Sequence, residues 1–267
     1  MLTNSFTVTT EKIIYLAVGL IGGFLIGFIF ANSANLGEQE SMRAELTRLR
    51  AGAAKGERAG AGSNNAGLRG DATDAALSDE ELRRAIANGD ANPNDIEKQR
   101  KIGRGIYLYA MNTGKTALLP DAVRLLRRAH KADPKDYETK VLLAEALFDA
   151  GQGGDAALIA EARKYFAEAL ATKPDDVNVR TELGLTYYFD QPPNPRRAIQ
   201  EYRRALALDP RHEMTLQSIA AALIVSGETV EAQRRLDELQ SVNSSNAALP
   251  NLRTQLAQVR DSAKERK

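Results

Sequence analysis

Residues that commonly carry enzyme chemistry are scarce in this chain. It has two histidines, His130 within RRAHKADP and His212 two residues after Pro210, and it has no cysteine. A thiol nucleophile, a cysteine zinc site and structural disulfides are therefore excluded. Neither histidine has a cysteine or carboxylate at metal-ligand spacing, so both are interpreted as solvated surface residues.

The motifs of common enzyme families are also missing. The sequence contains no P-loop, no G-x-G-x-x-G and no G-x-S-x-G pattern. Its 36 basic and 35 acidic residues give a formal net charge of +1, which provides no long-range field for nucleic acid. We therefore predict a protein that is not an enzyme, that has no cofactor or metal and that does not bind nucleic acid.

A single apolar segment near the amino terminus predicts a membrane anchor. Residues 13–31 read IIYLAVGLIGGFLIGFIFA without a charge, and as a helix they would extend about 28 Å, close to the thickness of the hydrocarbon layer. Ala31-Asn32-Ser33 also fits a signal-peptidase site, which leaves a cleaved signal peptide as the alternative. The apolar run exceeds the usual signal-peptide core, so we expect an uncleaved transmembrane helix.

Three glycines recur every fourth residue in this segment, at Gly19, Gly23 and Gly27. They would share one helix face and let a second helix approach closely, which predicts a dimer face. Glycine is also common in transmembrane helices in general, so the pattern has a simpler explanation as well.

The parts that flank the anchor have different compositions. Residues 1–12 form a short tail, and residues 32–50 carry Met42, Leu46 and Leu49 at coiled-coil spacing. Residues 51–77 are rich in Ala, Gly, Ser and Asn, as in a flexible linker. We expect the large domain in a bacterial periplasm and the anchor in the inner membrane, although the charges at the two ends nearly cancel.

A repeat dominates the second half of the chain. Ala122, Leu126, Ala129 and Pro134 are spaced by four, three and five residues. The same spacing recurs from Ala162 to Pro174 and from Ala198 to Pro210, and a weaker copy starts at Ala232. The first residues of the copies lie 40, 36 and 34 apart, so we expect insertions near 151–161 and near 191–195. Ser78 to Glu81 form a capping-box pattern that predicts a helix through about Asn88.

A second pattern precedes each copy, with Leu183-Gly184 and Tyr187 as the clearest example. Together with AIQEYRRALALDP from Ala198 to Pro210, it resembles the tetratricopeptide repeat (TPR) family. The resemblance covers about residues 100–246. It implies an all-α fold with a TPR solenoid of about four helix-turn-helix repeats over 78–249. A capping helix is expected over 250–267.

The resemblance also implies which side chains face the concave groove of the solenoid. In TPR proteins these are fixed positions on the first helix of each repeat. Here the expected peptide-binding residues are Arg104, Leu108, Met111, Val141, Glu145, Phe148, Leu185, Tyr188, Phe189 and Ile224. The apolar members suit an amphipathic helix or an extended apolar peptide, but they could instead pack against neighbouring helices.

These features predict a membrane-tethered TPR adaptor that binds protein or peptide clients. The layout is similar to that of the TPR assembly factors of bacterial cytochrome c maturation. Two alternatives remain open: a self-associating spacer within a membrane complex, and a docking receptor that faces the cytoplasm.

The dimer face can be tested with Gly23→Ile. If the glycine face drives self-association, the added side chain will separate the helices, and the detergent-solubilised protein will become monomeric. Analytical ultracentrifugation gives the mass. An unchanged oligomer that keeps its function would remove the main support for the spacer alternative.

Overall fold

The computed structural model describes residues 78–264, and every regular element in that range is a helix. The predicted all-α fold is confirmed for this range. None of the described helices is long and apolar enough to cross a bilayer. The predicted anchor (13–31), juxtamembrane helix (32–50) and linker (51–77) lie outside the described residues.

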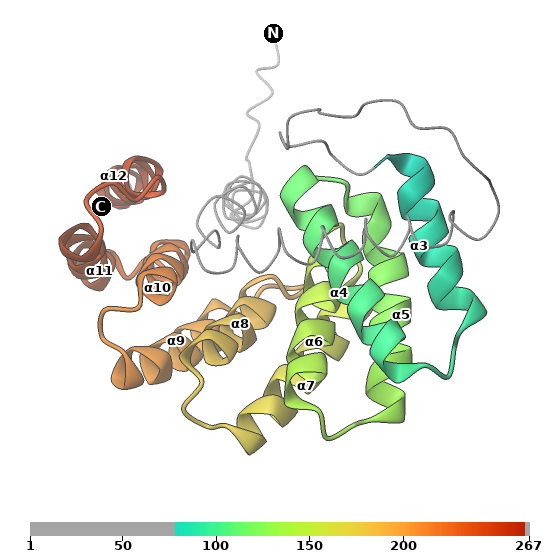
Figure 1. The fold of residues 1–267 in the computed structure, drawn as a ribbon. Helices are drawn as coiled ribbons and strands as arrows, with labels where there is room; N and C mark the ends of the chain where they lie inside the picture. Colours follow the sequence, from blue (N-terminus) through green and yellow to red (C-terminus); the bar gives the residue numbers. More distant parts are fainter. Residues whose placement is uncertain (1–77, 265–267) are drawn as a thin grey trace, which may run out of the picture. The chain divides into compact units, whose positions relative to one another are not determined.

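The described elements alternate between helices and short loops (Figure 1). They are α3 (Asp79–Ala91), α4 (Ile96–Thr113), the 3-10 turn η1 (Thr116–Leu118), α5 (Leu119–Ala132), α6 (Tyr137–Gly151), α7 (Ala156–Thr172), α8 (Val177–Tyr188), α9 (Pro195–Leu208), α10 (Glu213–Val225), α11 (Thr229–Val242) and α12 (Leu249–Lys264).

Two compact units make up this part of the chain, and their boundary falls inside α6. We call residues 78–146 the N-terminal unit and residues 147–264 the C-terminal unit. Each is described by itself below.

In the N-terminal unit, α3 begins as its sequence predicts. The Ser78 hydroxyl accepts a hydrogen bond from the Glu81 amide, and the Glu81 carboxylate accepts one from the Ser78 amide at 2.7 Å. The helix continues to Ala91, three residues beyond the predicted end. Next to it, α4 and α5 pack closely because Gly103 leaves room for the side chain of Leu126.

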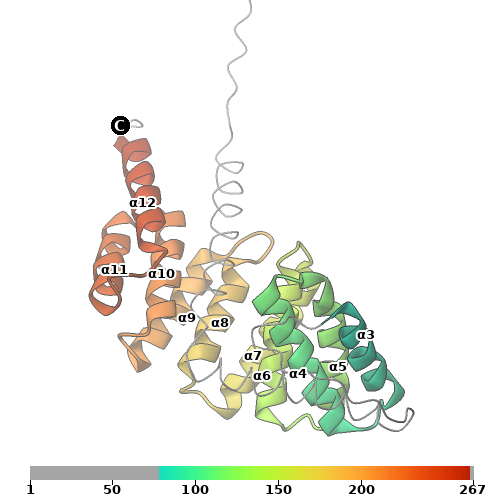
Figure 2. The ribbon, with the colours of Figure 1, turned by 45° about the horizontal axis from the view of Figure 1, so that its top comes forward.

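In the C-terminal unit, α8 packs against α9 and α10 packs against α11, and the two pairs lie next to each other (Figures 1 and 2). Gly184 on α8 faces the fully buried ring of Tyr202 on α9. An added Cβ at Gly184 would lie 2.7 Å from Tyr202 Cδ1, closer than real Cβ contacts. The small residue of one helix therefore makes space for the large residue of its partner.

A charged contact joins the same two helices. Glu201 on α9 is only 2% exposed, and its carboxylate accepts a hydrogen bond from Arg204 at 2.9 Å and one from Arg180 of α8 at 3.4 Å. Two arginines thus compensate the buried charge, so removing either would cost more than an exposed pair is worth.

At the carboxyl end, α12 buries Leu249, Leu252 and Leu256 and packs against α11 and α10. Between these residues it presents exposed polar side chains such as Arg253 and Thr254. This is the arrangement of a capping helix, and it begins one residue before the predicted start. The insertion expected near 151–161 is partly helical, because α7 begins at Ala156.

The close packing of α8 on α9 predicts the effect of Gly184→Ala. The new methyl group collides with the Tyr202 ring, so we expect a loss of about 1–3 kcal/mol in the free energy of unfolding, although alanine normally favours a helix. Urea unfolding followed by circular dichroism measures the change.

Gly153→Ala is the matched control. An added Cβ there would meet its nearest neighbour at 4.0 Å, and its backbone is not left-handed. We expect little change or a small gain in stability. Equal losses from the two substitutions would contradict the role assigned to Gly184.

Candidate functional site

Neither histidine is a solvated surface residue, contrary to the sequence-based interpretation. His130 lies on the buried side of α5 with 9% of its surface exposed. His212 is half-buried because it directly precedes α10, in a turn between two packed repeats. Both positions follow from the repeat itself, since the end of one helix and the start of the next pack against neighbouring helices.

His212 replaces the aspartate that starts other helices of this array. Asp136 precedes α6 and Asp176 precedes α8, and each accepts a hydrogen bond from the amide three residues later. The His212 side chain does not cap α10 in this way. Its two ring nitrogens instead lie 2.6 Å from Thr215 Oγ1 and 2.9 Å from Asn178 Oδ1.

The hydrogen bonds around His212 follow a fixed order. Thr181 donates to the Val177 carbonyl at 2.8 Å, and its hydroxyl lies 2.6 Å from that of Thr215. Since each hydroxyl has one proton, Thr215 donates to Thr181 and His212 Nδ1–H donates to Thr215. A neutral ring then accepts at Nε2, which requires the Asn178 amide to present its NH2 group.

The pKa of His212 is lowered, mainly because burial removes water from the charged ring. Nearby Asp209, Asp176 and Glu213 act in the opposite direction but do not outweigh burial. The folded protein therefore favours the neutral imidazole at this junction between α8 and α10.

In the N-terminal unit, the predicted groove residues are accessible. Arg104 is exposed, whereas Leu108 and Met111 on α4 and Val141 and Glu145 on α6 are half-buried. Apolar surface is therefore available at three ligand positions of this unit.

In the C-terminal unit, most of the predicted groove residues are buried. Phe148, Leu185, Tyr188 and Ile224 are at most 2% exposed, and Phe189 is half-buried. The Phe189 ring contacts Phe148 and Tyr188 edge to face, with ring centroids 5.7 and 5.2 Å apart. These side chains form one aromatic cluster from the ends of α6 and α8.

The hydroxyl group of Tyr188 is unusual within this cluster. Its oxygen is buried and has no hydrogen-bond partner, and burial raises the pKa of the phenol. An unpaired buried hydroxyl costs free energy that a bound polar group would recover. Sequence reasoning could assign Tyr188 to a face but could not detect this missing partner.

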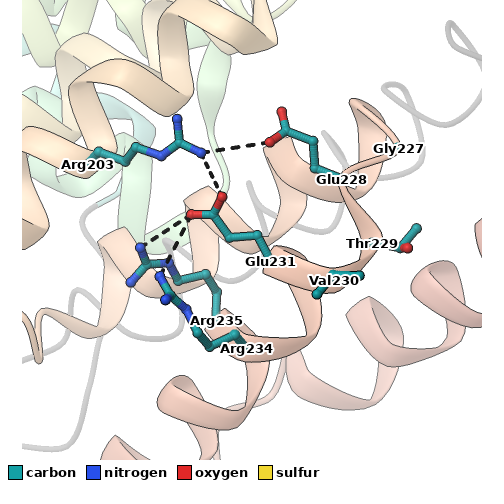
Figure 3. Close-up of a pocket in the computed structure, with 8 residues that line it drawn as sticks. All are labelled: Arg203, Gly227, Glu228, Thr229, Val230, Glu231, Arg234 and Arg235. Atoms are coloured by element: carbon teal, nitrogen blue, oxygen red, sulfur yellow. Dashed lines mark hydrogen bonds and ion pairs between the residues drawn. The ribbon is translucent and has the colours of Figure 1, made fainter.

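A shallow pocket lies elsewhere on the C-terminal unit, between α9 and the start of α11 (Figure 3). There Glu231 pairs with Arg203 at 2.6 Å and Arg235 at 3.4 Å, and Arg203 also approaches Glu228 at 3.7 Å. Its lining residues are Arg203, Gly227, Glu228, Thr229, Val230, Glu231, Arg234 and Arg235. The arginines are paired with carboxylates, so the pocket does not offer an unpaired charge to an anion.

Within residues 78–264, no group of His, Asp or Glu side chains is arranged to hold a metal ion. The predicted dimer face at Gly19, Gly23 and Gly27 lies outside this range.

Comparisons with known proteins identify the fold. Residues of this chain superpose on the structure of MamA 41-end from Desulfovibrio magneticus RS-1 with a TM-score of 0.50 and 19% identity, over 63% of this chain and 86% of that one. The structure of YrrB, a TPR protein with an unusual peptide-binding site, matches with a TM-score of 0.50 and 15% identity, over 66% and 84% of the two chains. A thermophilic TPR protein of Thermus thermophilus gives 0.49 and 17%, over 68% and 89%.

No family model and no curated protein matches the sequence. The structural likeness, together with the repeated helix pairs, gives the chain a TPR-like fold.

The buried position of His212 predicts how stability depends on pH. Because its folded pKa lies below the unfolded value of about 6.5, the unfolded chain binds more protons in acid. This contribution to stability is complete above pH 6.5 and is lost as the pH falls from there toward the folded pKa.

Urea unfolding between pH 7.5 and 5 measures this loss. The His212→Asn variant, which cannot titrate there, is expected to lose less stability on acidification. Identical pH profiles for the two proteins would show that His212 does not contribute.

Proposed function

We propose that this protein is a membrane-tethered TPR scaffold that binds protein or peptide clients on the first helices of its repeats. The observation that carries the proposal is the apolar character of the ligand positions on those helices. In the N-terminal unit, Leu108, Met111 and Val141 keep part of their surface accessible. Such surfaces favour an apolar or amphipathic segment, whose anchors each fill a shallow pocket.

The fold supports binding rather than catalysis. The likeness to TPR structures, one of which is described as having a peptide-binding site, is consistent with a scaffold. Among the described residues, the titratable groups that the sequence offered for chemistry have structural partners, as His212 does with Thr215 and Asn178.

The uncharged segment 13–31 supplies the proposed tether. Anchoring would confine the repeats to a layer near the bilayer and raise their effective concentration for membrane-associated clients. We place the repeats in the periplasm of a bacterial cell, on the outer side of the inner membrane. Assembly of membrane or envelope complexes, including cytochrome c maturation, is the process that this arrangement would suit.

Photocrosslinking in intact membranes tests the proposal. A photoreactive residue at Met111 is expected to capture a discrete client, because this ligand position is partly accessible. The same residue at Val230, whose exposed fraction is 84%, is the control. Protease accessibility of the repeats reports the side of the membrane.

A discrete partner at Met111 that is absent at Val230 would support the scaffold. The same products from both positions would contradict client binding on the first helices. Crosslinks from Met111 only to a second copy would favour the spacer alternative, and repeats protected inside sealed cells would favour a cytoplasmic receptor.

A further inference from the structure

The helix α10 is buried on every side. Ten successive residues, from Thr215 to Ile224, are at most 2% exposed. Because successive residues of an α-helix are about 100° apart, ten of them cover its whole circumference. A helix at the surface of a repeat array normally keeps one polar, solvated stripe, so this helix is an exception within the chain.

The buried residues include those that the TPR resemblance assigns to ligand contact. Gln217, Ala221 and Ile224 stand at those positions of α10 and are 1%, 0% and 2% exposed. On α8 the corresponding Leu185 and Tyr188 are equally buried. We call these five residues the inner face of the C-terminal unit. It is apolar except for Gln217 and the unpaired Tyr188 hydroxyl.

An occupant of the inner face must be apolar along its length, since a charged side chain would lose its water without gaining a partner. Residues 13–31 meet this requirement, because they form the longest run of this chain without a charged residue. Their glycine positions, at Gly19, Gly23 and Gly27, would permit close approach to a small residue such as Ala221.

The connection between the two parts is long enough. Residues 32–77 separate the segment from α3, which begins at Asp79, and a flexible chain of that length spans on the order of 35–40 Å. A segment held on such a linker has a millimolar effective concentration for its own chain, so it competes strongly with other ligands.

We propose that residues 13–31, when they are not in a bilayer, occupy the inner face of the C-terminal unit of the same chain. An uncharged 19-residue segment cannot remain open to water at little cost, and the inner face covers it. Insertion into the membrane then withdraws the segment and opens the face. This inference rests on the proposed function, because the client and the segment would use the same helices.

Cysteine crosslinking can test this directly, since the chain has no cysteine of its own. One cysteine replaces Val225, a half-buried residue at the end of α10. A second replaces Ile21 or Gly23, which point to opposite sides of a helix. The matched control places the first cysteine at Val230, on the exposed surface of α11. The full chain is made by cell-free synthesis, with or without phosphatidylglycerol nanodiscs, and treated with a short bismaleimide.

We expect an intramolecular crosslink from Val225→Cys without nanodiscs, at least fivefold more abundant than from Val230→Cys. With nanodiscs the crosslink should fall at least fivefold. Equal yields from the two positions would overturn the proposal by revealing non-specific collapse, and a crosslink only between chains would overturn it in favour of a second copy.

The two proposals can fail separately. If no crosslink forms in either condition while Met111 still captures its client in membranes, the occupant is wrong and the scaffold stands. If the crosslink forms equally with nanodiscs, the segment occupies the inner face, but it is not withdrawn by a bilayer, and the membrane tether is contradicted.

Discussion

Paired helices of this array can approach closely only where one of them has a very small residue opposite a large side chain of the other. At Gly184 the ring of Tyr202 occupies the volume that any Cβ would need, and Gly103 receives Leu126 in the same way. Further polar contacts, such as those of Glu201 with Arg180 and Arg204, depend on this separation between helix axes. A change at the close contact would therefore disturb every side chain that bridges the pair.

Sequence patterns predicted much of this architecture because they describe local requirements. The capping box at Ser78 needs only residues of one turn, and the alternation of small and large residues at fixed spacing defines the helix pairs. Both are found in the structure. The prediction was poorer for His212, because its burial depends on Thr215, Thr181 and Asn178 from two helices. Burial of this kind is a property of the assembled repeats.

The predicted ligand positions show the same limit. The family pattern says on which face Leu185, Tyr188 and Ile224 stand, but it does not say how much of that face is covered. In the N-terminal unit the equivalent side chains remain partly accessible, and in the C-terminal unit they are buried. Similar positions in different repeats therefore carry different roles, and a single pattern cannot assign one function to all of them.

The residues that precede the first helix of each repeat are also not interchangeable. Asp136 and Asp176 cap their helices with carboxylates, and His212 instead bridges to the preceding repeat through an imidazole. After α11 the corresponding turn uses Asn246, whose amide donates to Glu213. Each junction thus has its own polar chemistry, although the helices around it follow one plan. Exchanging repeats between positions would preserve the helix packing while leaving these polar groups without partners, so the order of the repeats is written into the turns that connect them.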